Sequence, residues 1–169
     1  MITRLVAPGD AAELAALLAA NRDFLAPWEP FRTEEYFTAE GHRTYLEDVL
    51  RQTDAGATLP HVIVEDGRIV GRITLSGITR GPFLSASLGY WVAQSANGRG
   101  VASAAVARMT RVAFDELGLH RVEAGTLVHN AASQRVLERT GFKRYGLAPR
   151  YLRINGEWRD HILFQLLAE

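Results

Sequence analysis

The segment from Ser85 to Val128 constrains the fold most, because its pattern predicts a strand, a long helix and a second strand in succession. Apolar residues alternate over Ser85–Ala93, recur at helical spacing from about Val101 to Leu117, and form another strand-like run over Arg121–Val128. Two strands joined through a helix need a crossover connection, so they run parallel. The segment therefore predicts a parallel pair of strands with a helix packed on the sheet.

The rest of the chain predicts mainly antiparallel strands. His61–Glu65 and Arg68–Leu75 flank Asp66-Gly67, a pair typical of the type I′ turn of a hairpin. Ile2–Val6 is a candidate edge strand, and Trp158–Leu167 alternates as a last strand. Hairpins combined with a crossover predict an α/β (α+β) fold, a mixed sheet with helices on its faces.

Two segments before the hairpin predict helices. Asp10 and Glu13 have the spacing of a capping box ahead of a leucine-rich helix. Tyr45–Leu50 carries the apolar face of a second helix. Between them, Phe24–Phe31 holds two prolines, so we expect no regular helix there.

Size and composition predict one domain over residues 1–169, since the length is close to the roughly 150 residues of a typical domain. The chain has no cysteine, which excludes a disulfide, a thiolate nucleophile and a sulfur-ligated zinc site. Nineteen basic residues balance nineteen acidic ones, so charge indicates neither a nucleic-acid nor a membrane partner. Without a signal-peptide core or an apolar run of roughly 20 residues, a cytoplasmic protein is expected.

The loop Gln94–Ala102 is the first segment that indicates chemistry. Gly98 and Gly100 allow a tight turn that brings backbone N–H groups close to a ligand, and the helix that follows adds unpaired donors and a positive dipole end. Such a loop favours an anion such as a pyrophosphate, although a glycine pair before a helix often serves only as a connection. Ser103 stands where GxGxxG would need its third glycine, and no Gly-Lys-Ser/Thr follows.

The second informative segment is His129–Phe142. It predicts a short helix over Ser133–Thr140 that ends at Gly141. Asn130 or Ser133 could cap this helix, which is one interpretation of these two polar residues. The other interpretation is that both side chains contact a bound ligand.

The two segments, in this order and spacing, resemble the GCN5-related N-acetyltransferase (GNAT) superfamily. The acetyl-CoA loop of that family reads Gln/Arg-x-x-Gly-x-Gly/Ala and falls here on Asn97–Ala102, where Asn97 departs from the usual first residue. The resemblance covers nearly the whole chain and is most specific to ribosomal-protein-alanine N-acetyltransferases of the Rim type. It is carried by NRDFLAPWEPF, GYWVAQSANGRGVA, HNAASQRVLERTGF and YLRINGEWRDHILF.

This resemblance implies the GNAT fold, a mostly antiparallel sheet with a central splayed parallel pair, and it implies acetyl-CoA as cosubstrate without a metal. The backbone of Trp91–Ala93 would bond the pantetheine arm, and an N–H aimed at the thioester carbonyl would stabilise an oxyanion by a few kcal/mol. Asn130 would bond the pantetheine end. The residues implied to contact acetyl-CoA are Trp91, Val92, Ala93, Asn97, Gly98, Arg99, Gly100, Val101, Ala102, Asn130 and Ser133.

The implied reaction is direct attack of an amine on acetyl-CoA, with Ser133 as general acid for the leaving thiolate. One branch of the family has a glutamate base where this chain has Leu152, which cannot serve. Deprotonating an α-amine at pH 7 costs only about 1 kcal/mol, against roughly 4–5 kcal/mol for lysine, so a weak base suits an α-amine. Glu29 is the candidate replacement, acting directly or through water; its alternative is a solvated loop carboxylate.

Other side chains are weaker candidates. His129 is more simply a structural residue at a strand end, and His161 beside Asp160 is expected to position the last strand. Five aromatic residues could line an acceptor cleft or belong to the core. They are Trp28, Phe31, Tyr36, Tyr151 and Trp158.

The leading functional hypothesis is acetylation of the N-terminal α-amine of a protein, with a ribosomal protein as the candidate acceptor. The alternatives are acetylation of a small-molecule amine, such as an antibiotic or polyamine, and a non-catalytic module that binds acyl-CoA. Direct nucleic-acid binding is not expected, because no basic stretch interleaved with aromatic residues is present. Both a monomer and a homodimer fit the sequence.

Overall fold

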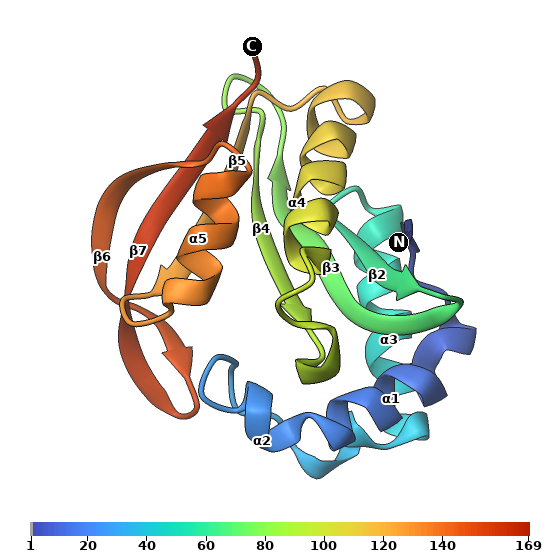
Figure 1. The fold of residues 1–169 in the computed structure, drawn as a ribbon. Coiled ribbons are helices and arrows are strands. Elements are labelled where there is room, and N and C mark those ends of the chain that lie inside the picture. Colours follow the sequence, from blue (N-terminus) through green and yellow to red (C-terminus); the bar gives the residue numbers. More distant parts are fainter. Residues whose placement is uncertain (1) are drawn as a thin grey trace.

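The structure is a computed structural model that describes residues 2–169, over which seven strands form one mixed sheet (Figure 1). Their order across the sheet is β1-β2-β3-β4-β5-β7-β6. The strands are β1 (Ile2–Leu5), β2 (Thr58–Glu65), β3 (Arg68–Thr79), β4 (Ser85–Val92), β5 (Arg121–Leu127), β6 (Lys143–Ile154) and β7 (Glu157–Leu167). The helices are α1 (Ala11–Ala20), α2 (Arg22–Leu25), α3 (Ala39–Asp54), α4 (Val101–Arg111) and α5 (Ala131–Arg139), with short turns at Pro8–Asp10, Glu34–Phe37, Gln94–Ala96 and Val112–Glu116.

The predicted parallel pair is confirmed as β4 and β5, and it is splayed. The two strands pair only over three positions, from Ser85 with Arg121 to Ser87 with Glu123. Beyond Ser87 they diverge, as the ribbon shows (Figure 1). Neighbouring strands elsewhere are antiparallel. The carboxyl-terminal half of β4 therefore has one edge that no strand of the sheet occupies.

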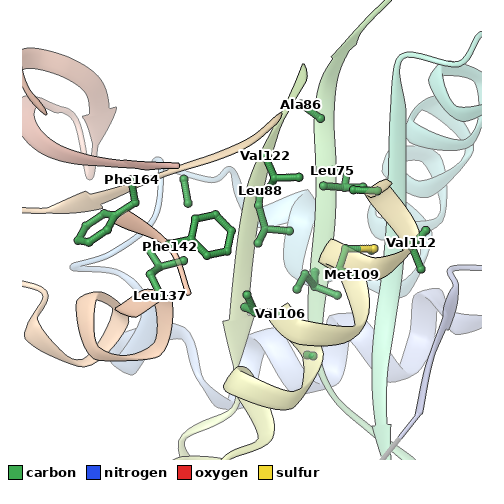
Figure 2. Close-up of a cluster of buried hydrophobic side chains, with 14 of the residues drawn as sticks. Leu75, Ala86, Leu88, Val106, Met109, Val112, Val122, Leu137, Phe142 and Phe164 are labelled. Atoms are coloured by element: carbon green, nitrogen blue, oxygen red, sulfur yellow. The ribbon is translucent and has the colours of Figure 1, made fainter. Parts of the chain in front are cut away.

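Helices cover both faces of the sheet. One core lies under α4 and α5, where Val106, Met109 and Val112 meet Leu75, Leu88 and the aromatic rings of Phe142 and Phe164 (Figure 2). The second core lies on the other face, where α1 and α3 pack on β2 and β3 through residues such as Leu14 and Leu46. Full burial of each such side chain contributes about 1.5–3 kcal/mol, so both faces hold the sheet in place.

The hairpin and the helix ends follow the predictions closely. β2 and β3 flank a turn in which Asp66 and Gly67 both have positive φ, 50° and 76°, as a type I′ turn requires. β1 is the edge strand that was predicted. α4 continues into one wide turn over Val112–Glu116 and ends before Gly118. No helix within residues 2–169 is long and apolar enough to cross a membrane.

Three local predictions need correction. The predicted capping box at α1 does not form, because Asp10 accepts from Arg4 and from the Ala7 N–H while Glu13 accepts from the Ile69 N–H. Part of the proline-containing segment is helical, since α2 runs to Leu25. The strand β6 was not predicted, because most of its residues are exposed and give no alternation.

Candidate functional site

The loop between β4 and α4 has the geometry of an anion site. Gly98 and Gly100 have φ of 75° and 79°, and a Cβ at either would meet nothing within 4 Å. Gly100 is the N-cap of α4 and no side chain caps the helix there. The first-turn N–H groups of α4 therefore face the loop with the positive end of the helix dipole, an arrangement that favours a diphosphate.

Two arginines of α5, which the sequence analysis did not name as site residues, add positive charge around the loop. A hollow of ≈ 320 Å³ in front of Gly98 and Gly100 is also lined by Arg135 and Arg139 of α5. Arg99, by contrast, binds Glu65 at 2.5 Å, so its guanidinium is committed to β2. Arg135 and Arg139 are four residues apart and lie on one helix face, which is a signal that the sequence contains.

The loop opens into a groove that ends in a central cavity. A second hollow of ≈ 290 Å³ shares Asn97, Ala102 and Val136 with the first. The central cavity of ≈ 340 Å³ shares Tyr90, Asn130 and Ser133 with the second hollow. The groove therefore runs from the loop along the free edge of β4 to the interior, between β4 and α5.

Backbone hydrogen bonds decide which part of β4 can bind a ligand. The Ala93 N–H donates to the Val70 carbonyl at 2.8 Å, and Trp91 pairs opposite Arg72 of β3. Because backbone groups alternate in direction along a strand, Trp91 and Ala93 turn theirs toward β3, while Tyr90 and Val92 turn theirs toward the open edge. Of the three residues predicted to bond the pantetheine arm, Trp91–Ala93, only Val92 turns its backbone N–H and C=O toward the open edge. Tyr90, which was not predicted, turns its backbone groups the same way.

Asn130 and Ser133 have separate parts at the start of α5. Asn130 is the cap, since its Oδ1 accepts from the Ser133 N–H at 3.1 Å. Its Nδ2 has no hydrogen-bond partner within residues 2–169, and the residue lines the groove. Ser133 Oγ does not cap the helix and instead lies 2.8 Å from the hydroxyl of Tyr90. The capping interpretation therefore holds for Asn130 and not for Ser133.

Tyr90 is a site residue that the sequence analysis missed. Its alternation with Leu88 and Val92 on β4 indicated only an apolar face, and the contact with Ser133 spans 43 residues of sequence. Burial raises the pKa of the Tyr90 phenol to about 12, so the hydroxyl keeps its proton throughout the neutral range. Tyr90 and Ser133 therefore form a linked pair of O–H groups on the groove.

Glu29 lies on the wall of the central cavity, half-buried in the loop after α2. Its carbonyl accepts from the Asn155 N–H at 2.9 Å, which ties this loop to the turn between β6 and β7. Burial raises the pKa of the Glu29 carboxyl, and the charges of Arg32 and Arg72 act against that rise. A carboxylate with a raised pKa is a better proton acceptor than a solvated one.

Leu152 and His161 also line the central cavity, and His161 is buried. His161 Nδ1 contacts the Arg159 carbonyl at 3.0 Å, whereas Asp160 accepts from the Arg150 N–H at 2.9 Å. His161 and Asp160 therefore do not pair with each other, and each contacts the backbone of β7 or β6 instead.

The remaining candidates are scattered. His129 is exposed and stacks on Trp28, with ring centroids 5.4 Å apart. Of the five aromatic candidates, Trp28 lines the central cavity, Tyr36 is buried, and Phe31, Tyr151 and Trp158 are exposed. Within residues 2–169 no group of three or more His, Cys, Asp or Glu side chains could hold a metal ion.

The fold and this groove define an acyltransferase that uses acetyl-CoA. Residues 1–143 match the family model of the acetyltransferase (GNAT) domain. The chain is 34% identical to the ribosomal protein uS5-alanine N-acetyltransferase of Escherichia coli over 168 residues, which cover 98% of this chain and 87% of the relative. The chain belongs to the GNAT acetyltransferase family.

Two solved structures are similar over nearly the whole chain. Mycobacterium smegmatis RimJ in complex with CoA-disulfide has a TM-score of 0.95 and 36% identity, covering 98% of this chain and 81% of that one. The ribosomal-protein-S5-alanine acetyltransferase of Vibrio fischeri has a TM-score of 0.92 and 35% identity, covering 98% and 91%. The family, the fold and the acetyl-CoA-dependent N-acetyltransferase activity predicted from the sequence are confirmed.

Proposed function

We propose that this protein transfers an acetyl group from acetyl-CoA to the N-terminal α-amine of a protein, with an alanine-initiated ribosomal protein as the candidate acceptor. The observation that carries the proposal is one cavity lined by a carboxyl, Glu29, and by a linked O–H pair, Ser133 and Tyr90. A proton acceptor and a proton donor facing one space are what amine acylation needs.

The anion-binding geometry supports a site for acetyl-CoA along the groove. The backbone of Gly98–Ala102 would hold the pyrophosphate, with Arg135 and Arg139 as further cationic partners. Asn130 Nδ2 and the backbone of Val92 would bond the pantetheine arm. When bound, acetyl-CoA supplies an acetyl group activated as a thioester.

The residues of the cavity would then accept and donate protons and stabilise the charge that develops during the reaction. Glu29 would accept a proton from the α-ammonium of the acceptor, directly or through water, which frees the nitrogen lone pair to form the new C–N bond. The Val92 N–H would stabilise the negative charge that develops on the carbonyl oxygen. As the C–S bond breaks, Ser133 Oγ–H would donate its proton to the thiolate and regain one from Tyr90 O–H. The second proton that the nitrogen loses would return through water to Tyr90, and Glu29 would release the first proton to solvent.

The choice of an α-amine rests on the base and on the relatives. Glu29 is a single carboxyl and Leu152 supplies no second one. A lone carboxyl suits an α-amine with a pKa near 8 far better than a lysine near 10.4. Two relatives at 34–35% identity, from Escherichia coli and Vibrio fischeri, are named for acetylating the alanine of ribosomal protein S5.

An acceptor panel tests this function. Thiol release from acetyl-CoA is measured with Ala- and Ser-initiated peptides, an N-terminally blocked lysine peptide, spermidine and an amino sugar. We expect a kcat/KM for the Ala-initiated peptide at least about tenfold above the others, which corresponds to about 1.4 kcal/mol. Preference for the amino sugar or spermidine would overturn the proposal, and no heat of acetyl-CoA binding in titration calorimetry would overturn the site itself.

The Glu29→Gln variant tests the base through its pH dependence. At pH 7 we expect kcat/KM for the peptide to fall about tenfold, because the neutral amide cannot take the amine proton. At pH 9 the loss should shrink to within about threefold, since an α-amine with a pKa near 8 is then mostly deprotonated without help. An equal loss at both pH values would assign Glu29 to acceptor binding.

Stability serves as the control for Glu29→Gln. Burial raises the pKa of Glu29 in the folded protein, so the ionised carboxyl opposes folding once the pH exceeds its unfolded pKa. The variant lacks that ionisation and should show no loss of unfolding free energy in urea at pH 7. A lower kcat/KM in a fully stable variant then reports on chemistry.

A further inference from the structure

Arg72 is a buried cation with spare donors. It lies on β3 at 8% exposure and lines the central cavity. Its Nη2 donates to the hydroxyls of Tyr45 at 3.0 Å and Tyr36 at 3.3 Å, and its guanidinium carbon is 5.0 Å from the centre of the Tyr45 ring. The two phenols thereby fix the orientation of the guanidinium.

The other side of the guanidinium has no partner. Within residues 2–169 Arg72 forms no ion pair, and its Nη1 and Nε make no hydrogen bond. Neither atom is among the fully enclosed donors of the chain, so both reach the cavity. Buried charges in proteins are normally paired, and an arginine left with free donors in a cavity calls for an oxygen acceptor from a ligand.

Glu29 lines the same cavity as Arg72. The charge of Arg72 acts on the pKa of Glu29, yet the two side chains make no ion pair. Within the cavity, the Glu29 carboxyl, a proton acceptor, is therefore separated from the Arg72 guanidinium, a hydrogen-bond donor. An α-amino group followed by a peptide bond offers the complement, because its carbonyl oxygen is attached one carbon beyond the amine-bearing carbon.

We propose that Arg72 is a specificity-determining residue that binds the carbonyl oxygen of the acceptor's first peptide bond. The site then takes amines that carry such a carbonyl, and it rejects lysine side chains and polyamines, which would place methylene groups or a second cation against the guanidinium. This inference rests on the proposed function, since it names the part of the α-amine acceptor that is recognised.

The test pairs two acceptors with two variants. One acceptor is an Ala-initiated peptide; the other is its (E)-alkene isostere, which keeps the shape of the first peptide bond and lacks the oxygen. In Arg72→Met we expect kcat/KM for the peptide to fall about 10- to 100-fold, the usual effect of losing a hydrogen bond to a charged group. For the isostere, kcat/KM of Arg72→Met should stay within about threefold of the wild-type value. Dividing the loss with the peptide by the loss with the isostere cancels the difference in reactivity between the two amines.

Tyr45→Phe provides the second variant, because it keeps the guanidinium and removes one hydroxyl that orients it. We expect a smaller loss with the peptide, about threefold, and none with the isostere. The affinity for CoA in titration calorimetry should be unchanged in both variants, since Arg72 and Tyr45 lie outside the loop hollow and the groove beside it. Unchanged CoA affinity also shows that both variants fold.

The outcomes separate the two proposals. If the wild-type enzyme acetylates the peptide, and Arg72→Met lowers kcat/KM equally for peptide and isostere, Arg72 has only a structural role and this inference is wrong. Equal use of peptide and isostere by the wild-type enzyme leads to the same conclusion. If the wild-type enzyme acetylates no α-amine, the proposed function fails and the inference fails with it.

Discussion

Gly100→Asp is expected to raise the Kd for acetyl-CoA at least about a hundredfold, which is about 2.7 kcal/mol. The residue is the N-cap of α4, where the helix turns unpaired N–H groups toward the loop hollow. A carboxylate there neutralises the positive end of the helix dipole that would otherwise attract the ligand, and it faces a ligand with two phosphate charges. At an effective dielectric constant near 20, one pair of like charges about 4 Å apart costs about 4 kcal/mol, so the expected loss is conservative.

Gly100→Asn is the matched control, because asparagine has the shape of aspartate without its charge. Gly100 has a φ of 79°, a region that both side chains tolerate better than most, and a Cβ there meets nothing within 4 Å. Any backbone strain is therefore shared by the two variants. We expect Asn to cost less than about tenfold in titration calorimetry. Equal losses in the two variants would show that conformation, and not charge, explains the effect.

The elements that were predicted correctly are those that local pattern specifies. The type I′ turn at Asp66-Gly67 and the left-handed Gly98 and Gly100 follow from residues that tolerate positive φ. The parallel pair follows from the need for a crossover. The turn and the two glycines rest on a few residues of sequence, and the parallel pair rests on the order of three consecutive patterned segments.

The elements that were missed depend on distant partners or on exposure. Glu13 does not form the predicted capping box, because its carboxylate accepts a hydrogen bond from the Ile69 N–H, 56 residues away in sequence. β6 has few buried residues and a register shift near Arg150, which has a φ of 49°, so no alternation marks it. Spacing and motif could suggest Ser133, but only the packing of α5 beside β4 reveals its partner.

The central cavity also depends on contacts between residues that are distant in sequence. Glu29 was a candidate because Leu152 cannot act as the base and Glu29 is a carboxylate in a proline-flanked loop, whereas Arg72 lies in an ordinary strand pattern. Its importance follows from two phenols, Tyr36 and Tyr45, brought to it by a turn and a helix. A charged residue inside a buried strand is the one sequence signal that could have drawn attention to it.

Ser133→Ala is expected to lower kcat at least about 100-fold while the Kd for acetyl-CoA changes by less than about threefold, since general acid catalysis contributes about 10²–10⁴-fold. Ser133 Oγ is hydrogen-bonded to Tyr90, while the cap of α5 belongs to Asn130. Losing the hydroxyl therefore leaves the helix intact and removes only the proton donor. Steady-state thiol release with saturating peptide gives kcat, and titration calorimetry gives the Kd.

Tyr90→Phe distinguishes a proton relay from a lone serine donor. If Tyr90 reprotonates Ser133, Tyr90→Phe should lower kcat nearly as much as Ser133→Ala, and the double variant should lose little more, because residues that act as one unit are not additive. The pKa of Tyr90, raised by burial to about 12, keeps its proton available throughout the assay range. Additive losses would assign the two hydroxyls independent roles, and an unchanged kcat in Ser133→Ala would remove the general acid from this mechanism.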